Sequence, residues 1–129
     1  MNFKAWDNKN KRWIHQGEFN IHSDGSVWNH ESEWTEHKRF DATLCRNTGL
    51  KDKNSVEIFE FDIIKSSTPN FTIIRRVEYS NESASFVLYK IPFDKRFMHN
   101  EPIKQDWLLD YSSEVIGNIF DTPHLLEAK

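Results

Sequence analysis

The 129-residue sequence is poor in cysteine, glycine and proline, with one, four and four residues of these types. The single cysteine, Cys45, excludes a disulfide within the chain, and a lone thiol is typical of a reducing compartment such as the cytosol. Four glycines leave little material for loops that cradle phosphate groups, and no phosphate loop, Gly-x-Ser-x-Gly motif or dinucleotide fingerprint occurs. These scarcities argue against the common nucleotide-binding and hydrolase classes.

Long apolar runs and a strong net charge are also missing. No segment approaches the roughly 20 apolar residues that span a bilayer, and the opening, Met1 to Asp7, lacks the apolar core of a signal peptide. We therefore expect a cytoplasmic protein with no membrane partner. The net charge is −3, and residues 99–129 hold six acidic and two basic residues. This acidic end disfavours nonspecific nucleic-acid binding and is typical of a solvated surface.

Large aromatic side chains are what the sequence has in abundance. Aromatic residues make up 14% of the chain, with five Trp and ten Phe, although only 37% of the residues are hydrophobic. Each ring removes a large apolar area from water, so a compact core is feasible and disorder is disfavoured. The length fits one domain, residues 1–129, since two domains would each bury too little.

Alternating and β-branched patterns predict a mainly β fold with minor α structure. The predicted strands cover residues 3–6, 11–14, 42–46, 56–64, 71–79, 85–89 and 114–120. The run at 56–64 is either two strands or one bent strand, and Asp106–Asp110 is a short helical turn. Thr122 is the predicted N-cap of a short C-terminal helix that begins at Pro123. Many short strands favour a small barrel or sandwich, and a parallel sheet is disfavoured.

Three segments carry a resemblance to a known family, and they reach both ends of the chain. They are Phe3-Lys4-Ala5-Trp6-Asp7, then Thr48-Gly49-Leu50-Lys51-Asp52-Lys53-Asn54 with Glu57-Ile58-Phe59-Glu60-Phe61-Asp62-Ile63-Ile64, and finally Glu114-Val115-Ile116-Gly117-Asn118-Ile119-Phe120 with Pro123 and Leu125-Leu126. In this order they resemble the YopX-type proteins of phages and prophages. The resemblance implies an SH3-like barrel or curled antiparallel sheet in a mobile-element setting. It brings no established activity, cofactor or catalytic residue.

Two positions depart from the pattern of that family. Ser55 follows Asn54 and Phe61 precedes Asp62, where the family usually has glycine. Glycine at such points often serves a turn or bulge with positive φ, which serine and phenylalanine adopt poorly. We therefore expect the two local turns to differ in this chain.

Histidines and carboxylates form two groups that suggest metal or acid–base chemistry. His15, His22, His30 and His37, with Glu31, Glu33 and Glu36 nearby, lack the pair of ligands within about two to five residues that zinc sites usually have. Asp52, Glu57, Glu60 and Asp62 have neither a partner base nor a phosphate-binding loop. We interpret the first group as solvated or structural histidines, and the second as turn chemistry and an edge strand. No catalytic, metal or cofactor residue is assigned.

Two further features concern a thiol and a pair of arginines. Cys45 lies in the predicted strand Leu44-Cys45-Arg46, which favours packing over nucleophilic chemistry. Arg75 and Arg76, with Phe71 and Tyr79 nearby, are candidates for contact with single-stranded nucleic acid. Adjacent strand residues face opposite sides, however, so at most one of the two arginines can join a given patch.

The leading functional hypothesis is a non-enzymatic phage or prophage accessory protein that acts by protein–protein contact. The partner is a second copy of the chain, giving a homo-oligomer, or another host or phage protein. Trp28 and Trp34 are the candidate interface anchors, because tryptophan is favoured there. Nucleic-acid binding through Arg75, Arg76, Phe71 and Tyr79 is the second hypothesis. A metal-dependent enzyme that uses the histidines or the acidic group is the third.

Overall fold

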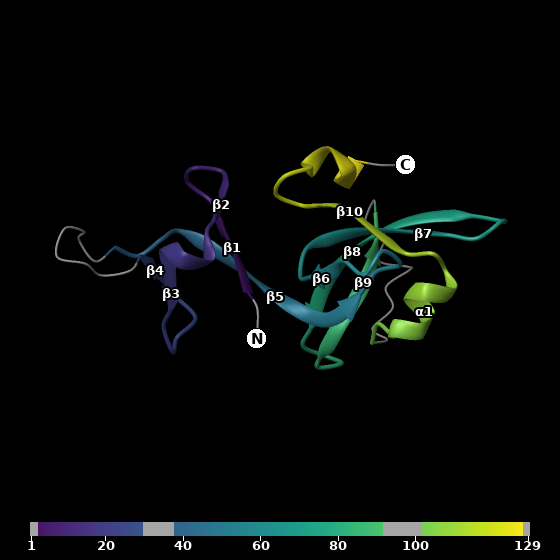
Figure 1. Cartoon of the computed structure of the whole chain (residues 1–129), viewed down its shortest axis with the longest axis horizontal. Helices are drawn as coiled ribbons and strands as arrows, with labels where there is room; N and C mark the ends of the chain where they lie inside the picture. Colours follow the sequence, from purple (N-terminus) through teal and green to yellow (C-terminus); the bar gives the residue numbers. More distant parts are fainter. Residues whose placement is uncertain (1–2, 30–37, 92–101, 128–129) are drawn as a thin grey trace. The chain divides into compact units, whose positions relative to one another are not determined.

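The computed structural model describes residues 3–29, 38–91 and 102–127, and it divides the chain into two compact units. Unit 1 is Met1–Arg46 and unit 2 is Asn47–Lys129. Strand β5 (Ala42–Lys51) runs across the boundary (Figure 1). Each unit has its own apolar cluster. Within the described ranges no helix is long and apolar enough to cross a membrane.

Unit 1 consists of short antiparallel strands. Its elements are β1 (Phe3–Asp7), β2 (Arg12–Ile14), the 3₁₀ helix η1 (Gln16–Glu18), β3 (Phe19–Ile21) and β4 (Val27–Asn29). β1 pairs with β2 on one side and with the first half of β5 on the other, and β3 pairs with β4. The alternating side chains of these strands bury Ala5, Ile14, Phe19 and Val27 together. The predicted hairpin of residues 3–6 and 11–14 is thereby confirmed.

A buried carboxylate organises the turn between β1 and β2. Asp7 is 2% exposed, and its Oδ1 accepts hydrogen bonds from the backbone nitrogens of Lys9 (3.0 Å) and Asn10 (3.1 Å). Its Oδ2 accepts from Asn10 Nδ2 at 2.8 Å. Burial opposes ionisation of this carboxyl, but the hydrogen bonds from Asn10 and Lys9 hold its pKa below the ordinary value of 3.8.

Unit 2 is a curled antiparallel sheet with a helix on one face. Its elements are β6 (Glu57–Phe59), β7 (Asp62–Ser67), β8 (Thr72–Ser80), β9 (Ser85–Lys90), α1 (Gln105–Asp110), β10 (Glu114–Asn118) and the 3₁₀ helix η3 (Pro123–Glu127). The main sheet has the order β10-β7-β8-β9, and β6 pairs with the second half of β5. One cluster of buried side chains joins sheet and helix: Ile58, Ile64, Val77, Leu88 and Leu108. The mainly β, curled architecture confirms the predicted fold class.

The local predictions for unit 2 hold with one difference. The hairpin of β8 and β9 is formed in full, and the run at 56–64 is two strands, β6 and β7. At the C-terminus Pro123 begins a helix as predicted, but it is a 3₁₀ helix. Thr122 precedes it and its carbonyl accepts from the Leu125 nitrogen at 3.0 Å, whereas its hydroxyl bonds Asn118. That hydroxyl donates to the Asn118 carbonyl (2.8 Å) and accepts from the Asn118 nitrogen (3.0 Å), so it is already used by the preceding turn.

Ser55 and Phe61 both have left-handed backbone, with φ of 65° and 73°. The chain therefore keeps the conformation that glycine favours, contrary to the expectation that these turns differ. Neighbouring contacts hold Phe61 there: its N–H donates to the Val77 carbonyl, its carbonyl accepts from the Ile119 nitrogen, and its ring packs edge-on against Phe120. A left-handed residue with a Cβ costs roughly 1–2 kcal/mol, which such contacts offset.

Candidate functional site

Four side chains of unit 2 form a cluster where α1 lies against the sheet. This aromatic–arginine cluster consists of Phe71, Arg75, Trp107 and Tyr111. Phe71 directly precedes β8 and Arg75 lies within it, whereas Trp107 is in α1 and Tyr111 directly follows that helix. The cluster thus joins two segments that lie more than 30 residues apart in the sequence.

Arg75 lies on the sheet face that the helix covers. It pairs across the strands with Ile64, a core residue, so both side chains point to the same face. The centre of its guanidinium lies 4.4 Å from the ring centroid of Trp107, the geometry of a cation–π contact. Its Nη2 donates to Ser66 Oγ at 3.4 Å. Burial of the guanidinium lowers the pKa of Arg75 to about 10, partly offset by the nearby Tyr111.

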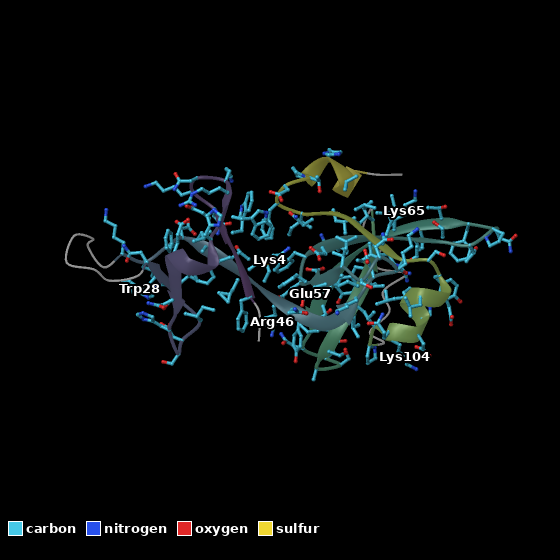
Figure 2. The ribbon with its side chains drawn as sticks, in the orientation of Figure 1. Lys4, Trp28, Arg46, Glu57, Lys65 and Lys104 are labelled. Carbon is cyan, nitrogen blue, oxygen red and sulfur yellow. The ribbon has the colours of Figure 1, made fainter. Side chains whose placement is uncertain are left out.

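The helix is held in place from both ends. α1 begins directly after Lys104 (Figure 2), and the side-chain amide of its first residue, Gln105, bonds both backbone groups of Lys51. Leu108 is fully buried in the core. After the helix, the Tyr111 carbonyl accepts from the Ser67 nitrogen at 2.7 Å, which ties it to the end of β7. Backbone and core contacts of the helix therefore fix the positions of the Trp107 and Tyr111 rings.

The outer side of the cluster is exposed and apolar. Phe71 is 50% exposed, and its ring centroid lies 6.5 Å from that of Tyr111. Tyr111 in turn lies 5.0 Å from Trp107. Leu109, two residues after Trp107 and therefore on another side of the short helix, is 53% exposed as well. An exposed ring beside a guanidinium can take up both an apolar group and an anion.

The residues predicted to contact nucleic acid are only partly brought together. Phe71 and Arg75 belong to the aromatic–arginine cluster. Arg76 faces the other side of the sheet, as its position next to Arg75 requires, and its Nε donates to Glu78 Oε2 at 2.9 Å.

Tyr79 follows Arg75 on the same face of β8, four residues along, which is about 13 Å at the usual rise of a strand. Its ring packs edge-on against Phe86, with the centroids 5.4 Å apart. Tyr79 is thus separated from the aromatic–arginine cluster along the strand.

One of the two candidate interface tryptophans, Trp28, lies in β4. Trp28 is half-buried, its ring stacks on His22 with the centroids 5.0 Å apart, and its Nε1 donates to Ser26 Oγ at 2.8 Å. Its face and its polar edge therefore both have partners within unit 1. Trp34 lies outside the described residues.

Asp52, the first of the predicted acidic group, is a structural acceptor in unit 2. It is 3% exposed, and its Oδ1 accepts from the backbone nitrogens of Asn54 (2.8 Å) and Val56 (2.9 Å). Its Oδ2 accepts from the Val115 nitrogen in β10 at 2.9 Å. The same turn contains Ser55, whose nitrogen donates to the Asp52 carbonyl at 3.0 Å.

The other carboxylates of that group also fit a structural interpretation. Asp62 is buried and accepts from the Phe59 nitrogen at 2.8 Å across the turn between β6 and β7. Glu60 is buried in that turn, and Glu57 is exposed on β6. Two of the four side chains are thus acceptors for backbone N–H groups, in agreement with the predicted turn chemistry.

The remaining candidates do not converge on a site. His15 and His22 are exposed, and Cys45 is buried in β5 with Sγ 4.0 Å from the Thr43 carbonyl. Among residues 3–29, 38–91 and 102–127, no three His, Cys, Asp or Glu side chains are placed to hold a metal ion. The other members of the histidine group lie outside these ranges: His30, His37, Glu31, Glu33 and Glu36.

The sequence interpretation missed Trp107 and Tyr111 as site residues. Their segment is predicted only as a short helical turn, and a single sequence holds no signal that pairs it with β8. A local signal is present, since Trp107 in the helix and Tyr111 directly after it are four residues apart and so lie on one side of the helix.

Comparisons with known proteins concern the whole chain. The family model described as YopX protein matches residues 2–127. The fold is similar to that of protein EF1440 from Enterococcus faecalis, with 24% identity, 97% of this chain and 96% of that chain covered, and a TM-score of 0.68. It is also similar to protein yopX from Bacillus subtilis, with 16% identity, 98% and 96% covered, and a TM-score of 0.60. No curated protein matches the chain.

Proposed function

We propose that this chain, which belongs to the YopX family, is a non-enzymatic accessory protein of a phage or prophage that acts by protein–protein contact. Self-association is the simplest form of this proposal. The observation that carries it is the exposed apolar side of the aromatic–arginine cluster, where Phe71 is 50% exposed and packs against Tyr111. The buried thiol of Cys45 suits the reducing host cytoplasm in which we expect it to act.

The composition of this surface supports the proposal of an interface. Aromatic residues and arginine are enriched at interface centres, and tryptophan, tyrosine and arginine carry most of the binding energy there. Trp107, Tyr111 and Arg75 are held in position by the core and by backbone contacts, so binding would cost them little further entropy.

Packing of faces fits unit 2 better than pairing of strand edges. On β9, the Phe86 carbonyl already accepts from the Ile103 nitrogen at 3.1 Å. At the other edge, Asp52 occupies the Val115 nitrogen, and the Ser113 carbonyl before β10 accepts from Lys53. A strand from a second copy would have to displace these bonds.

The test is size-exclusion chromatography with light scattering over a range of protein concentrations. We expect the native protein to form an oligomer, and Phe71→Glu to shift it towards the monomer by placing a charge in the contact. Val56→Glu is the matched control, since Val56 is 48% exposed in unit 2 but lies in the Asp52 turn. A native monomer at every concentration would remove self-association, and an oligomer insensitive to Phe71→Glu would remove this surface.

Single-stranded nucleic acid is the second candidate ligand, because Phe71 and Arg75 combine a ring with a cation in one place. Two features weigh against it. Arg76 is engaged by Glu78, and α1 carries Asp106 and Asp110 close to Trp107. The absorbance ratio at 260 and 280 nm across the chromatographic peak tests this candidate: bound nucleic acid raises the ratio and dissociates with salt.

A further inference from the structure

Arg75 has far fewer hydrogen bonds than its guanidinium can make. An arginine carries five N–H donors. Within the described residues Arg75 makes one hydrogen bond, from Nη2 to Ser66 Oγ, and its 3.4 Å length is beyond the usual range. Its Nε is buried with no partner among those residues. Buried charges normally have an opposite charge beside them, and none of the described carboxylates forms an ion pair with Arg75.

The Ser66 hydroxyl is a weak substitute for an anion. It is fully buried, carries no charge, and lies 2.8 Å from Ser113 Oγ, closer than the 3.4 Å that separates it from Arg75 Nη2. The stacking on Trp107 satisfies the face of the guanidinium but leaves the N–H groups around its edge unpaired. The depressed pKa of Arg75 has the same cause, a positive charge that burial disfavours and no anion offsets.

We propose that the aromatic–arginine cluster recognises a carboxylate on a protein segment, with Arg75 binding the carboxylate and Phe71 contacting an adjacent apolar side chain. This inference rests on the proposed function and names the chemistry of its partner. A carboxylate matches the planar fork of the guanidinium with two parallel hydrogen bonds. Either an acidic side chain or a C-terminal carboxylate can supply it.

The charge around the cluster favours one carboxylate on an otherwise apolar segment over a polyanion. Residues 47–129 hold ten basic and thirteen acidic residues, a net charge of −3. Asp106 and Asp110 lie in the same helix as Trp107. Every phosphate of a polyanion would be repelled by the negative charge of unit 2. A single carboxylate is attracted by the partly buried Arg75 and is repelled much less.

The test is an NMR titration of the ¹⁵N-labelled full chain that follows the Arg75 Nε–H and the Trp107 indole N–H. The probes are N-acetyl-phenylalanine, which carries a terminal carboxylate, and acetyl-Phe-Asp-amide, which carries only a side-chain carboxylate. N-acetyl-phenylalanine amide is the uncharged match. We expect saturable shifts of both signals with at least one carboxylate probe, and binding of the amide at least about tenfold weaker. The stronger of the two carboxylate probes identifies the source.

Three variants separate recognition from folding. Arg75→Met fills the same space without the charge, so we expect it to abolish probe binding without lowering the melting temperature, because it removes an unpaired buried cation. Arg76→Met is the matched control on the opposite face and should bind the probe normally. Phe71→Ala, at a half-exposed position, should weaken binding several-fold in a fully folded protein.

Several outcomes would overturn the inference. They are absence of saturable shifts with both carboxylate probes, equal binding of the amide, or binding that survives Arg75→Met. A melting temperature lowered far more by Arg75→Met than by Arg76→Met, with Phe71→Ala binding normally, would assign Arg75 a structural role instead. Preferred binding of oligothymidylate or inorganic phosphate would assign the cluster to phosphates. If the protein is monomeric but binds the carboxylate probes, self-association is wrong and carboxylate recognition by the cluster still holds.

Discussion

Two buried aspartates, Asp7 in unit 1 and Asp52 in unit 2, organise turns by the same local device. Each is nearly inaccessible, and one oxygen of each accepts two backbone N–H groups from the next few residues. Each turn also contains a non-glycine residue in the left-handed region, Lys11 with φ of 56° and Ser55 with φ of 65°. Local sequence chemistry thus produces nearly the same turn twice.

The two turns differ in what the second carboxylate oxygen binds. In Asp7 it accepts from the side chain of Asn10, three residues away. In Asp52 it accepts from the Val115 nitrogen, 63 residues away, and so ties the turn to strand β10. The same kind of turn can therefore be bonded only to its own residues, as at Asp7, or can also be bonded to a distant strand, as at Asp52.

The largest effect should come from Asp52→Ala. The substitution leaves three backbone N–H groups without their acceptor, and we expect the free energy of unfolding to fall by about 3–5 kcal/mol. Urea denaturation measures the loss, and hydrogen exchange at the Val115 amide shows whether β10 is released. Asp52→Asn keeps one acceptor oxygen and should lose about half as much. A loss below about 1 kcal/mol, or unchanged exchange at Val115, would break the proposed long-range tie.

Asp7→Ala should destabilise less, by about 1–2 kcal/mol, because the N–H groups that it frees belong to exposed residues that water can reach. Hydrogen exchange should accelerate within the β1–β2 hairpin alone. Denaturation under the conditions used for Asp52→Ala gives the direct comparison. If Asp7→Ala lowers the free energy of unfolding as much as Asp52→Ala does, the long-range bond to Val115 adds nothing to the stability.

Ser55→Gly and Lys11→Gly should stabilise the chain, each by about 0.5–1 kcal/mol, because glycine adopts positive φ without the steric cost of a Cβ. The greater flexibility of glycine in the unfolded chain offsets part of the gain. Differential scanning calorimetry of the two variants tests whether the turns are strained alike. Gly25, with φ of 87°, offers the reverse control, since Gly25→Ala should destabilise.

The smallest effect concerns pH. Since the pKa of Asp7 is lower in the folded chain than its ordinary value of 3.8, its carboxylate contributes stability above that value. This contribution is lost as the pH falls through the folded-state pKa. The native protein should therefore lose more stability below about pH 4 than Asp7→Asn does, as acid titrations of urea unfolding would show. Parallel curves for the two proteins would contradict the shift.

The sequence was sufficient for features that depend on neighbours along the chain. Alternation predicts the hairpin of β8 and β9, and the Asp7–Asn10 stretch predicts the turn between β1 and β2. The opposite orientation of Arg75 and Arg76 follows from the geometry of any strand. The family membership and the mainly β class were likewise recognisable from the quoted segments.

Features that depend on distant residues were not predictable. The contact of Arg75 with Trp107 and the bond from Val115 to Asp52 join segments that only the folded sheet brings together. The left-handed backbone at Phe61 was hidden for another reason: tertiary contacts hold a bulky residue where local preference would place glycine. The Thr122 hydroxyl was available for a cap but bonds Asn118 instead.

The bond between Asp52 and Val115 also has a consequence for the order of folding. Its formation closes a loop of 63 residues, so we expect it to form late in folding. Bonds that form after the transition state slow unfolding and leave the folding rate nearly unchanged. We therefore expect Asp52 mainly to slow the unfolding of unit 2, and so to lengthen the lifetime of its native state.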